Sequence, residues 1–197
     1  MKARSSLGDN MNAVVMSPRI LKPRFLVCSI WEVLQLRRKA KGALYVWDPV
    51  NKSISGNVCT AEGLNALLNI MFNGATQITT WYVLIFETDT TPADGTTYAT
   101  PVFTESTAYD ELTRPEYEEA AASSKSITNS ANKAEFTINA TKTIYGGALV
   151  GGGTGASTKG DTAGGGKLYC ASKFGASKSV VDDDVLLVTI TLTAADV

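Results

Sequence analysis

Tyr169 and Lys173 stand four positions apart in the stretch KLYCASKFG, and Ser157 lies shortly before them. A Tyr-x-x-x-Lys pair with an upstream serine is typical of the short-chain dehydrogenases. In that family the tyrosine is the general acid, and the lysine lowers its pKa. The chemistry to be tested first is therefore oxidoreduction.

The surroundings of this pair do not support that chemistry. A dehydrogenase of this kind places a glycine-rich turn after its first strand, where it opens a helix that holds the pyrophosphate. Here the glycines of residues 151–166 come directly before the tyrosine, and only 24 residues (197 − 173) follow Lys173. The alternation of apolar side chains across 168–174 predicts a β-strand instead. We expect a structural strand at this position.

Other catalytic and metal-binding chemistry is restricted by composition. The chain has no histidine, which excludes Ser-His-Asp and Cys-His catalysis and histidine-dependent zinc sites. Its three cysteines are widely spaced and predict reduced thiols. The run Asp182–Asp184 lacks the spaced oxygen ligands of a calcium loop, so we interpret it as a solvated acidic turn. We predict no enzymatic activity, no cofactor and no metal.

The charges are distributed unevenly along the chain. Residues 1–42 hold nine Lys/Arg and two acids (+7), whereas the remainder holds nine basic and 17 acidic residues (−8), which together give the net charge of −1. Such a division indicates a basic region that contacts an acidic partner surface. The candidate contact residues are Arg4, Arg19, Lys22, Arg24, Arg37, Arg38, Lys39 and Lys41.

One domain with an N-terminal arm is predicted. Residues 1–24 carry two prolines and no sustained periodicity, so we expect an extended basic arm. Residues 25–197 are expected to form a mainly β domain, a β-sandwich of about eight strands with one short helix near 61–73. No run of apolar residues is long enough for a membrane helix, and the apolar run 25–36 is interrupted by Glu32, which argues against a signal peptide.

Several local expectations belong to this domain. We expect a hairpin with strands near 25–36 and 43–48 around a turn at 37–42, the second strand ending at Pro49. Thr60 is the expected N-cap of the helix, and Gly74 its terminator. The helix stripe Leu64, Leu67, Leu68, Met71 and Phe72 is expected to face the core. Residues 79–87 predict a central strand, and residues 151–166 a flexible loop that contacts a neighbour.

Longer stretches resemble a group of virion structural proteins of tailed bacteriophages. The likeness covers roughly residues 57–193 and rests on the helix EGLN, the strand TTWYV, the segment YDELTRP, the strand AEFTI, the stretch LYCASKF and the final strand ending in LT. A Gly/Ser/Thr loop precedes LYCASKF, as in that group. The chain departs from the pattern after Val83, where a glycine is expected, and in the first 24 residues, which have no counterpart.

The resemblance implies a non-enzymatic role in a virion, made in the cytoplasm of the bacterial host. The preferred role is a capsid decoration (cement) protein on the outer surface of the head, with the major capsid protein and neighbouring copies of itself as partners. A tail or head–tail connector component is the alternative. A surface module that binds carbohydrate or a receptor, with Trp31, Trp47 or Trp81 as a stacking platform, is a second alternative. Membrane or nucleic-acid partners are not expected.

Overall fold

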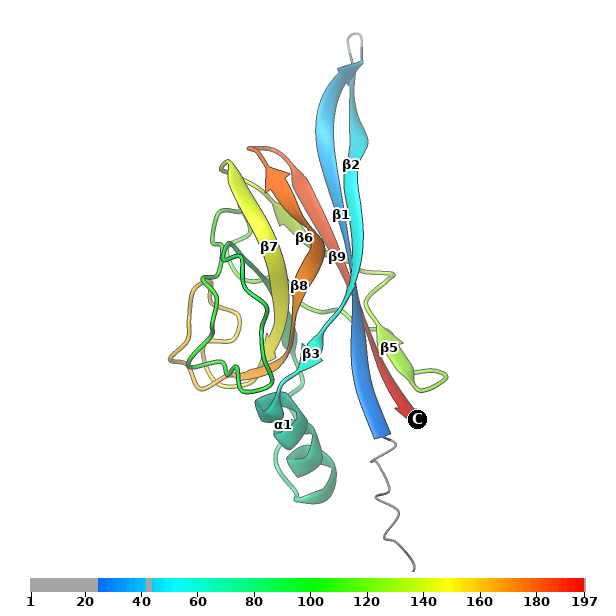
Figure 1. Cartoon of the computed structure of the whole chain (residues 1–197), viewed down its shortest axis with the longest axis vertical. Coiled ribbons are helices and arrows are strands. Elements are labelled where there is room, and N and C mark those ends of the chain that lie inside the picture. Colours follow the sequence, from blue (N-terminus) through cyan, green and yellow to red (C-terminus); the bar gives the residue numbers. More distant parts are fainter. Residues whose placement is uncertain (1–24, 42–43, 197) are drawn as a thin grey trace, which may run out of the picture.

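The protein is mainly β, with two antiparallel sheets and, among the described residues, one helix. In this computed structural model residues 25–41 and 44–196 are described (Figure 1). The elements are β1 (Phe25–Lys41), β2 (Leu44–Gly56), β3 (Val58–Cys59), α1 (Ala61–Phe72), β4 (Trp81–Phe86), β5 (Ser126–Thr128), β6 (Ala134–Thr137), β7 (Lys142–Gly151), β8 (Lys167–Val180) and β9 (Val185–Asp196). The predicted arm, residues 1–24, lies outside the described residues.

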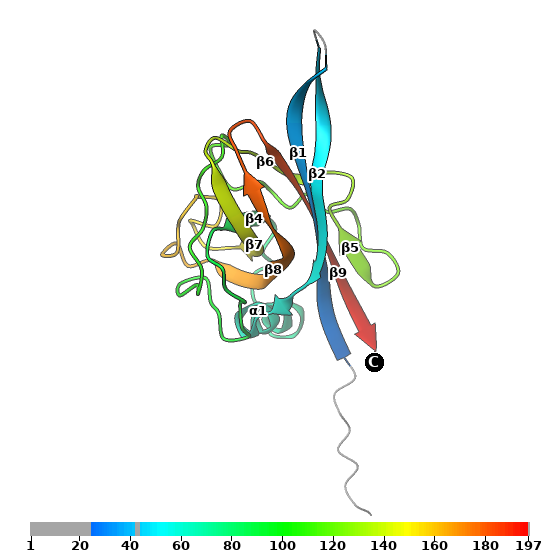
Figure 2. The ribbon, with the colours of Figure 1, turned by 45° about the horizontal axis from the view of Figure 1, so that its top comes forward.

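The two sheets pack face to face as a β-sandwich. In the first sheet the strand order is β2-β1-β9-β5, and β6 also pairs with β9; in the second sheet the order is β3-β8-β7-β4. Figure 2 shows the two layers side by side, with α1 at one end of the sandwich. The predicted mainly β class and sandwich architecture are confirmed.

The core between the two sheets includes alternate side chains of β1 and β9. Leu186, Val188 and Ile190 are completely buried, whereas the residues between them are half-buried and lie on the outer face. Trp31 of β1 pairs with Ile190 and is also completely buried. Because strand side chains alternate between faces, this register places one apolar row of each strand in the core.

The second sheet is buried on both faces, and this explains its continuous apolar runs. A separate cluster packs on its outer side, where Phe86 stacks on Phe103 with ring centroids 4.4 Å apart. The expectation that β4 is central is wrong, since β4 is the last strand of its sheet. Its outer edge is covered by an irregular segment: Val83 donates to Pro115, and Tyr117 donates to Trp81, both at 2.8 Å.

The β1–β2 hairpin is longer than the sequence predicts, and the prediction of a turn at 37–42 is wrong for residues 37–41. Residues 37–41 continue β1, and the pairing runs to Lys41 opposite Leu44. Pro49 does not end β2, because β2 is an edge strand, where a proline is tolerated. Pro49 is in register with Leu36, and the register shift between Gln35 and Leu36 leaves Val50 next to it as the extra residue of a bulge.

Helix α1 begins as predicted but does not pack as predicted. The Thr60 hydroxyl accepts a hydrogen bond from the Gly63 N–H at 3.0 Å, and Gly74 has a left-handed φ of 67° after the last turn. Gly63 is the one buried residue of the helix, and a Cβ there would lie 2.4 Å from the Tyr169 carbonyl oxygen. The helix therefore contacts β8 through a glycine. Of its apolar stripe, Leu67 packs against the core, whereas Leu68, Met71 and Phe72 are exposed.

Candidate binding surface

The Tyr169–Lys173 pair lies on β8 and does not form a catalytic arrangement. Tyr169 is buried, and its ring packs edge-on against Trp81 at 5.6 Å between centroids. Burial raises the pKa of its hydroxyl well above the ordinary value. Lys173 is exposed and pairs with Asp89 at 2.5 Å. Residues four apart on a strand are separated by roughly 13 Å, too far for the lysine to act on the tyrosine.

A buried arginine, Arg114, organises the outer side of the second sheet. Its side chain is 1% exposed and forms a two-pronged ion pair with Glu105, with Nε to Oε1 at 2.8 Å and Nη2 to Oε2 at 2.5 Å. The remaining donors bind the Tyr98 hydroxyl, the Ala156 carbonyl and the Asp161 carbonyl. A guanidinium has five N–H donors, and here all five have acceptors.

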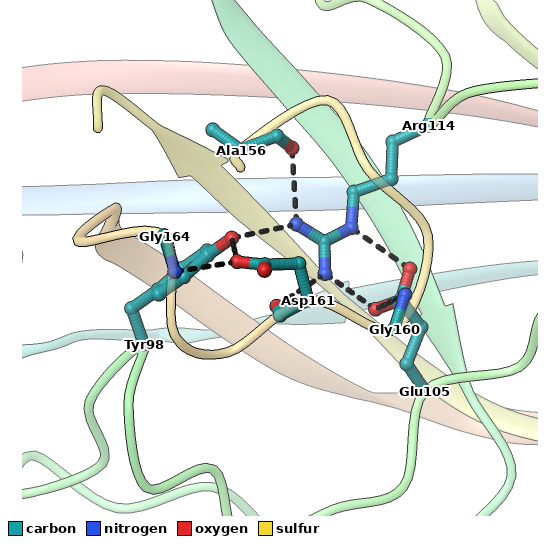
Figure 3. A network of polar contacts seen from close by, with 7 residues as sticks. All are labelled: Tyr98, Glu105, Arg114, Ala156, Gly160, Asp161 and Gly164. Atoms are coloured by element: carbon teal, nitrogen blue, oxygen red, sulfur yellow. Dashed lines mark hydrogen bonds and ion pairs between the residues drawn. The ribbon is translucent and has the colours of Figure 1, made fainter. Parts of the chain in front are cut away.

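This network fastens the glycine-rich loop 151–166 (Figure 3). The Tyr98 hydroxyl donates to Asp161 Oδ1 at 2.7 Å, and Gly164 N–H donates to the same oxygen at 2.8 Å. These bonds hold the pKa of Asp161 below its ordinary value. Gly160 N–H donates to Glu105 at 2.9 Å. The loop predicted to be flexible is therefore tied to the body at several points.

Arg37, a predicted contact residue, is part of an internal ion pair. It donates to both oxygens of Asp184, at 2.8 and 2.7 Å, and Gln35 donates to Oδ2 at 2.9 Å. Burial opposes the charge of Asp184, but these hydrogen bonds and one from the Val181 N–H outweigh it and lower the pKa. The expectation of a solvated acidic turn holds for Asp182 and Asp183, which are exposed, and is wrong for Asp184, which is 1% exposed.

Beyond Arg37 the hairpin leaves the body. The pairing of β1 with β9 ends at Leu36, whereas its pairing with β2 continues to the end of the hairpin. Residues 37–41 and 44–48, which we call the ribbon, therefore project past the sandwich (Figures 1 and 2). Arg38 and Lys39 are exposed on it, and Lys39 pairs with Asp48 at 2.5 Å with both side chains in solvent.

The side chains of the other predicted contact residues lie outside the described part of the structure. Lys41 lies in β1 opposite Leu44, but its side chain is outside the described part. The four residues of the arm also lie outside the described residues: Arg4, Arg19, Lys22 and Arg24.

The three tryptophans lie in different environments. Trp31 is completely buried in the core, and Trp81 is half-buried. Trp47 is 52% exposed on the ribbon, opposite Arg38 in the strand register. Of the three, Trp47 alone presents a broad apolar surface to solvent.

A second surface was missed by the sequence interpretation. Helix residues expected in the core are exposed: Leu68 by 52%, Met71 by 65% and Phe72 by 82%. Beside them lies an apolar groove of about 650 Å³, which we call the α1 groove. It is lined by Leu67, Ile70 and Met71 of α1, by Ile78, Trp81, Leu149 and Tyr169, and by residues of β5 and β9 including Leu192 and Ala194. The apolar periodicity of α1 was the available signal, but it does not say what covers the stripe.

Two further properties concern the described residues. No helix among them is both long and apolar enough to cross a membrane. Within the same residues, no group of three or more acidic or cysteine side chains is arranged to hold a metal ion. Comparison of the chain with protein-family models gives no match, and comparison with curated proteins gives none either.

Proposed function

We propose that this protein is a structural component of a tailed-phage virion, and specifically a capsid decoration protein that binds and stabilises the assembled head. The proposal combines the resemblance of residues 57–193 with one structural observation, the projecting ribbon. The partners are the major capsid protein and neighbouring copies of this chain on the outer surface of the head.

The ribbon supports a binding role because it has no core of its own. An isolated two-stranded hairpin is marginally stable in water, and three or more strands or a packed face are normally needed. The ribbon lacks a third strand beyond Leu36 and exposes Val46 and Trp47 together with its cations. An aromatic side chain beside positive charge is a frequent composition at the centre of protein interfaces. A partner surface would supply the missing packing.

Decoration also explains how modest contacts stabilise a shell. A protein that binds the assembled lattice and not its dissociated subunits shifts the assembly equilibrium toward the lattice. The exposed ion pairs of the ribbon contribute little one at a time, about 0.2–1 kcal/mol. Many copies that each bridge two subunits add these contributions over the whole particle.

Two other roles are separated from this one by specific observations. A tail or head–tail connector component would use the same ribbon in a few copies per particle. A carbohydrate- or receptor-binding module is favoured by the exposure of Trp47, because a flat aromatic ring can stack on a sugar. A glycan screen with a Trp47→Ala control separates this third role from the other two.

The decisive experiment is the copy number of this protein in purified virions, measured by quantitative mass spectrometry against the major capsid protein. Hundreds of copies are the expected result for decoration. A dozen or fewer would assign the protein to the tail or the connector, and none would refute the virion role. Deletion of residues 1–24 should then weaken head binding, and unchanged binding would refute a contribution from the arm.

A further inference from the structure

The α1 groove is an apolar surface without a cover in the described part of the chain. Phe72, 82% exposed, and Met71, 65% exposed, stand at the end of a helix that packs on the body through Gly63. Exposure of large apolar side chains to water is unfavourable, and exposed apolar clusters are typical of binding sites. Its volume of about 650 Å³ is within the range of ligand and peptide pockets.

The groove is lined by residues of both sheets and of α1. The first sheet contributes Leu192 and Ala194 of β9. Tyr169 and Leu149, which also line the groove, belong to the main core. Glu119 and Lys125 are the charged residues among those that line it. A segment bound here would continue the core rather than cover an isolated patch.

We propose that the α1 groove binds residues 11–16 of the same chain, Met-Asn-Ala-Val-Val-Met. The described chain begins beside the groove: Phe25 pairs with Asp196, and Val27 pairs with Ala194, which lines the groove. Figures 1 and 2 both place the first residues of β1 and helix α1 at the same end of the molecule. The 24 residues that precede β1 therefore enter the structure next to the groove.

The length of the intervening chain permits this placement. Residues 17–24 span up to roughly 27 Å when extended, and the groove begins two residue pairs from the start of β1, or about 7 Å away. A chain of this length can reverse direction after residue 16 and still reach Met71.

Composition selects residues 11–16 within the first 24. The segment has five apolar side chains in six positions, and it carries no charge. The cations of the region lie on either side of it, Lys2 and Arg4 before it and Arg19, Lys22 and Arg24 after it. Binding of the apolar run would leave these cations outside the groove and available to an acidic partner. The inference does not depend on the proposed role in a virion.

Photo-crosslinking in the full-length protein tests the proposal. A benzoylphenylalanine replaces Met71, the protein is irradiated at low concentration, and the products are separated by mass and mapped by peptide mass spectrometry. The expected product is a monomer in which position 71 is joined to residues 11–16. The matched control carries the same probe at Val46, on the ribbon at the other end of the molecule, and should give no such product.

Two variants define the specificity of the crosslink. Val14→Asp combined with Val15→Asp should reduce its yield at least tenfold, because charges would enter an apolar groove, whereas Ser5→Asp with Ser6→Asp should leave the yield unchanged. A crosslinked dimer would overturn the proposal in favour of a second copy as occupant. A monomer without a crosslink to residues 11–16 would overturn it as well.

Discussion

Arg114 and the ribbon use the same kind of side chain in opposite ways. Arg114 is buried, satisfies all five donors within the protein and holds the loop 151–166 against the second sheet. The ribbon cations Arg38 and Lys39 stand on two strands without a core beneath them. Arg37 lies at the boundary, where its ion pair with Asp184 anchors the ribbon to the body.

The comparison shows that the clustering of charged residues in the sequence does not indicate whether they form internal ion pairs or an exposed surface. Arg114, which stands alone in the sequence, has acceptors for all five of its donors. In the run 37–39, Arg37 forms an ion pair with the body, whereas Arg38 and Lys39 are exposed. Desolvation decides the difference, because a buried ion must be fully paired to be tolerated and an exposed ion need not be. We therefore expect substitutions in the two regions to change different quantities.

The largest effect is expected at Arg114. Arg114→Met should lower the free energy of unfolding by about 3–5 kcal/mol, because the Glu105 carboxylate, 8% exposed, would lose its partner. Urea denaturation followed by fluorescence measures the loss. The matched control is Lys142→Met, which removes the more exposed pair with Glu87 and should cost less than about 1 kcal/mol. Adding Glu105→Gln to Arg114→Met should restore part of the lost free energy of unfolding. Equal losses for Arg114→Met and Lys142→Met would contradict the comparison.

An intermediate effect is expected at Asp184. Asp184→Asn should cost about 2 kcal/mol at pH 7, since two hydrogen bonds from Arg37 and one from Gln35 would lose a charged acceptor. The folded pKa of Asp184 is lowered, so its contribution is complete above the unfolded value of about 3.9 and is lost as the pH falls through the folded pKa. Unfolding curves from pH 7 to pH 2 should show the two proteins converging below about pH 4. A constant difference down to pH 2 would contradict this account.

The smallest effect on stability is expected on the ribbon. Arg38→Gln combined with Lys39→Gln should change the free energy of unfolding by no more than about 0.5 kcal/mol. The same variant should weaken binding to heads that lack the protein at least tenfold, with a reduced dependence on salt. Co-sedimentation at two salt concentrations measures this, and Lys173→Gln is the control for an exposed lysine elsewhere. Unchanged binding would remove the ribbon cations from the proposed interface.

Features that depend on local chain geometry could be predicted from the sequence. The Thr60 cap, the turn at Gly74 and the alternation of 186–192 each require only neighbouring residues, and all three are present. The turn of the hairpin could not be placed, because residues 37–41 have no core on either face and so show no alternation. The prediction that Pro49 ends a strand is wrong, because the sequence does not show which strand is at the edge.

The remaining errors concern contacts between distant segments. The network that holds the loop 151–166 joins residues far apart in the sequence: Tyr98, Glu105, Arg114 and Asp161. Composition alone does not show such contacts, and it predicts a flexible loop. Asp184 resembles its two neighbours in sequence, but the left-handed φ of 65° at Asp183 marks the turn after which Asp184 faces inward. The prediction of a core face on α1 is wrong for Leu68, Met71 and Phe72, because periodicity identifies an apolar stripe and not the surface that covers it.

The pairing of β1 with β9 also determines the order in which the domain can fold. Phe25 pairs with Asp196, so the first sheet cannot close until residues 185–196 have left the ribosome. Until then β1 has only β2 beside it, and its apolar face, including Trp31 and Val33, has no partner. Pairings between distant segments form slowly, and unpaired apolar strands aggregate in the meantime. The yield of native protein should therefore depend on synthesis temperature and chaperone supply more strongly than its equilibrium stability suggests.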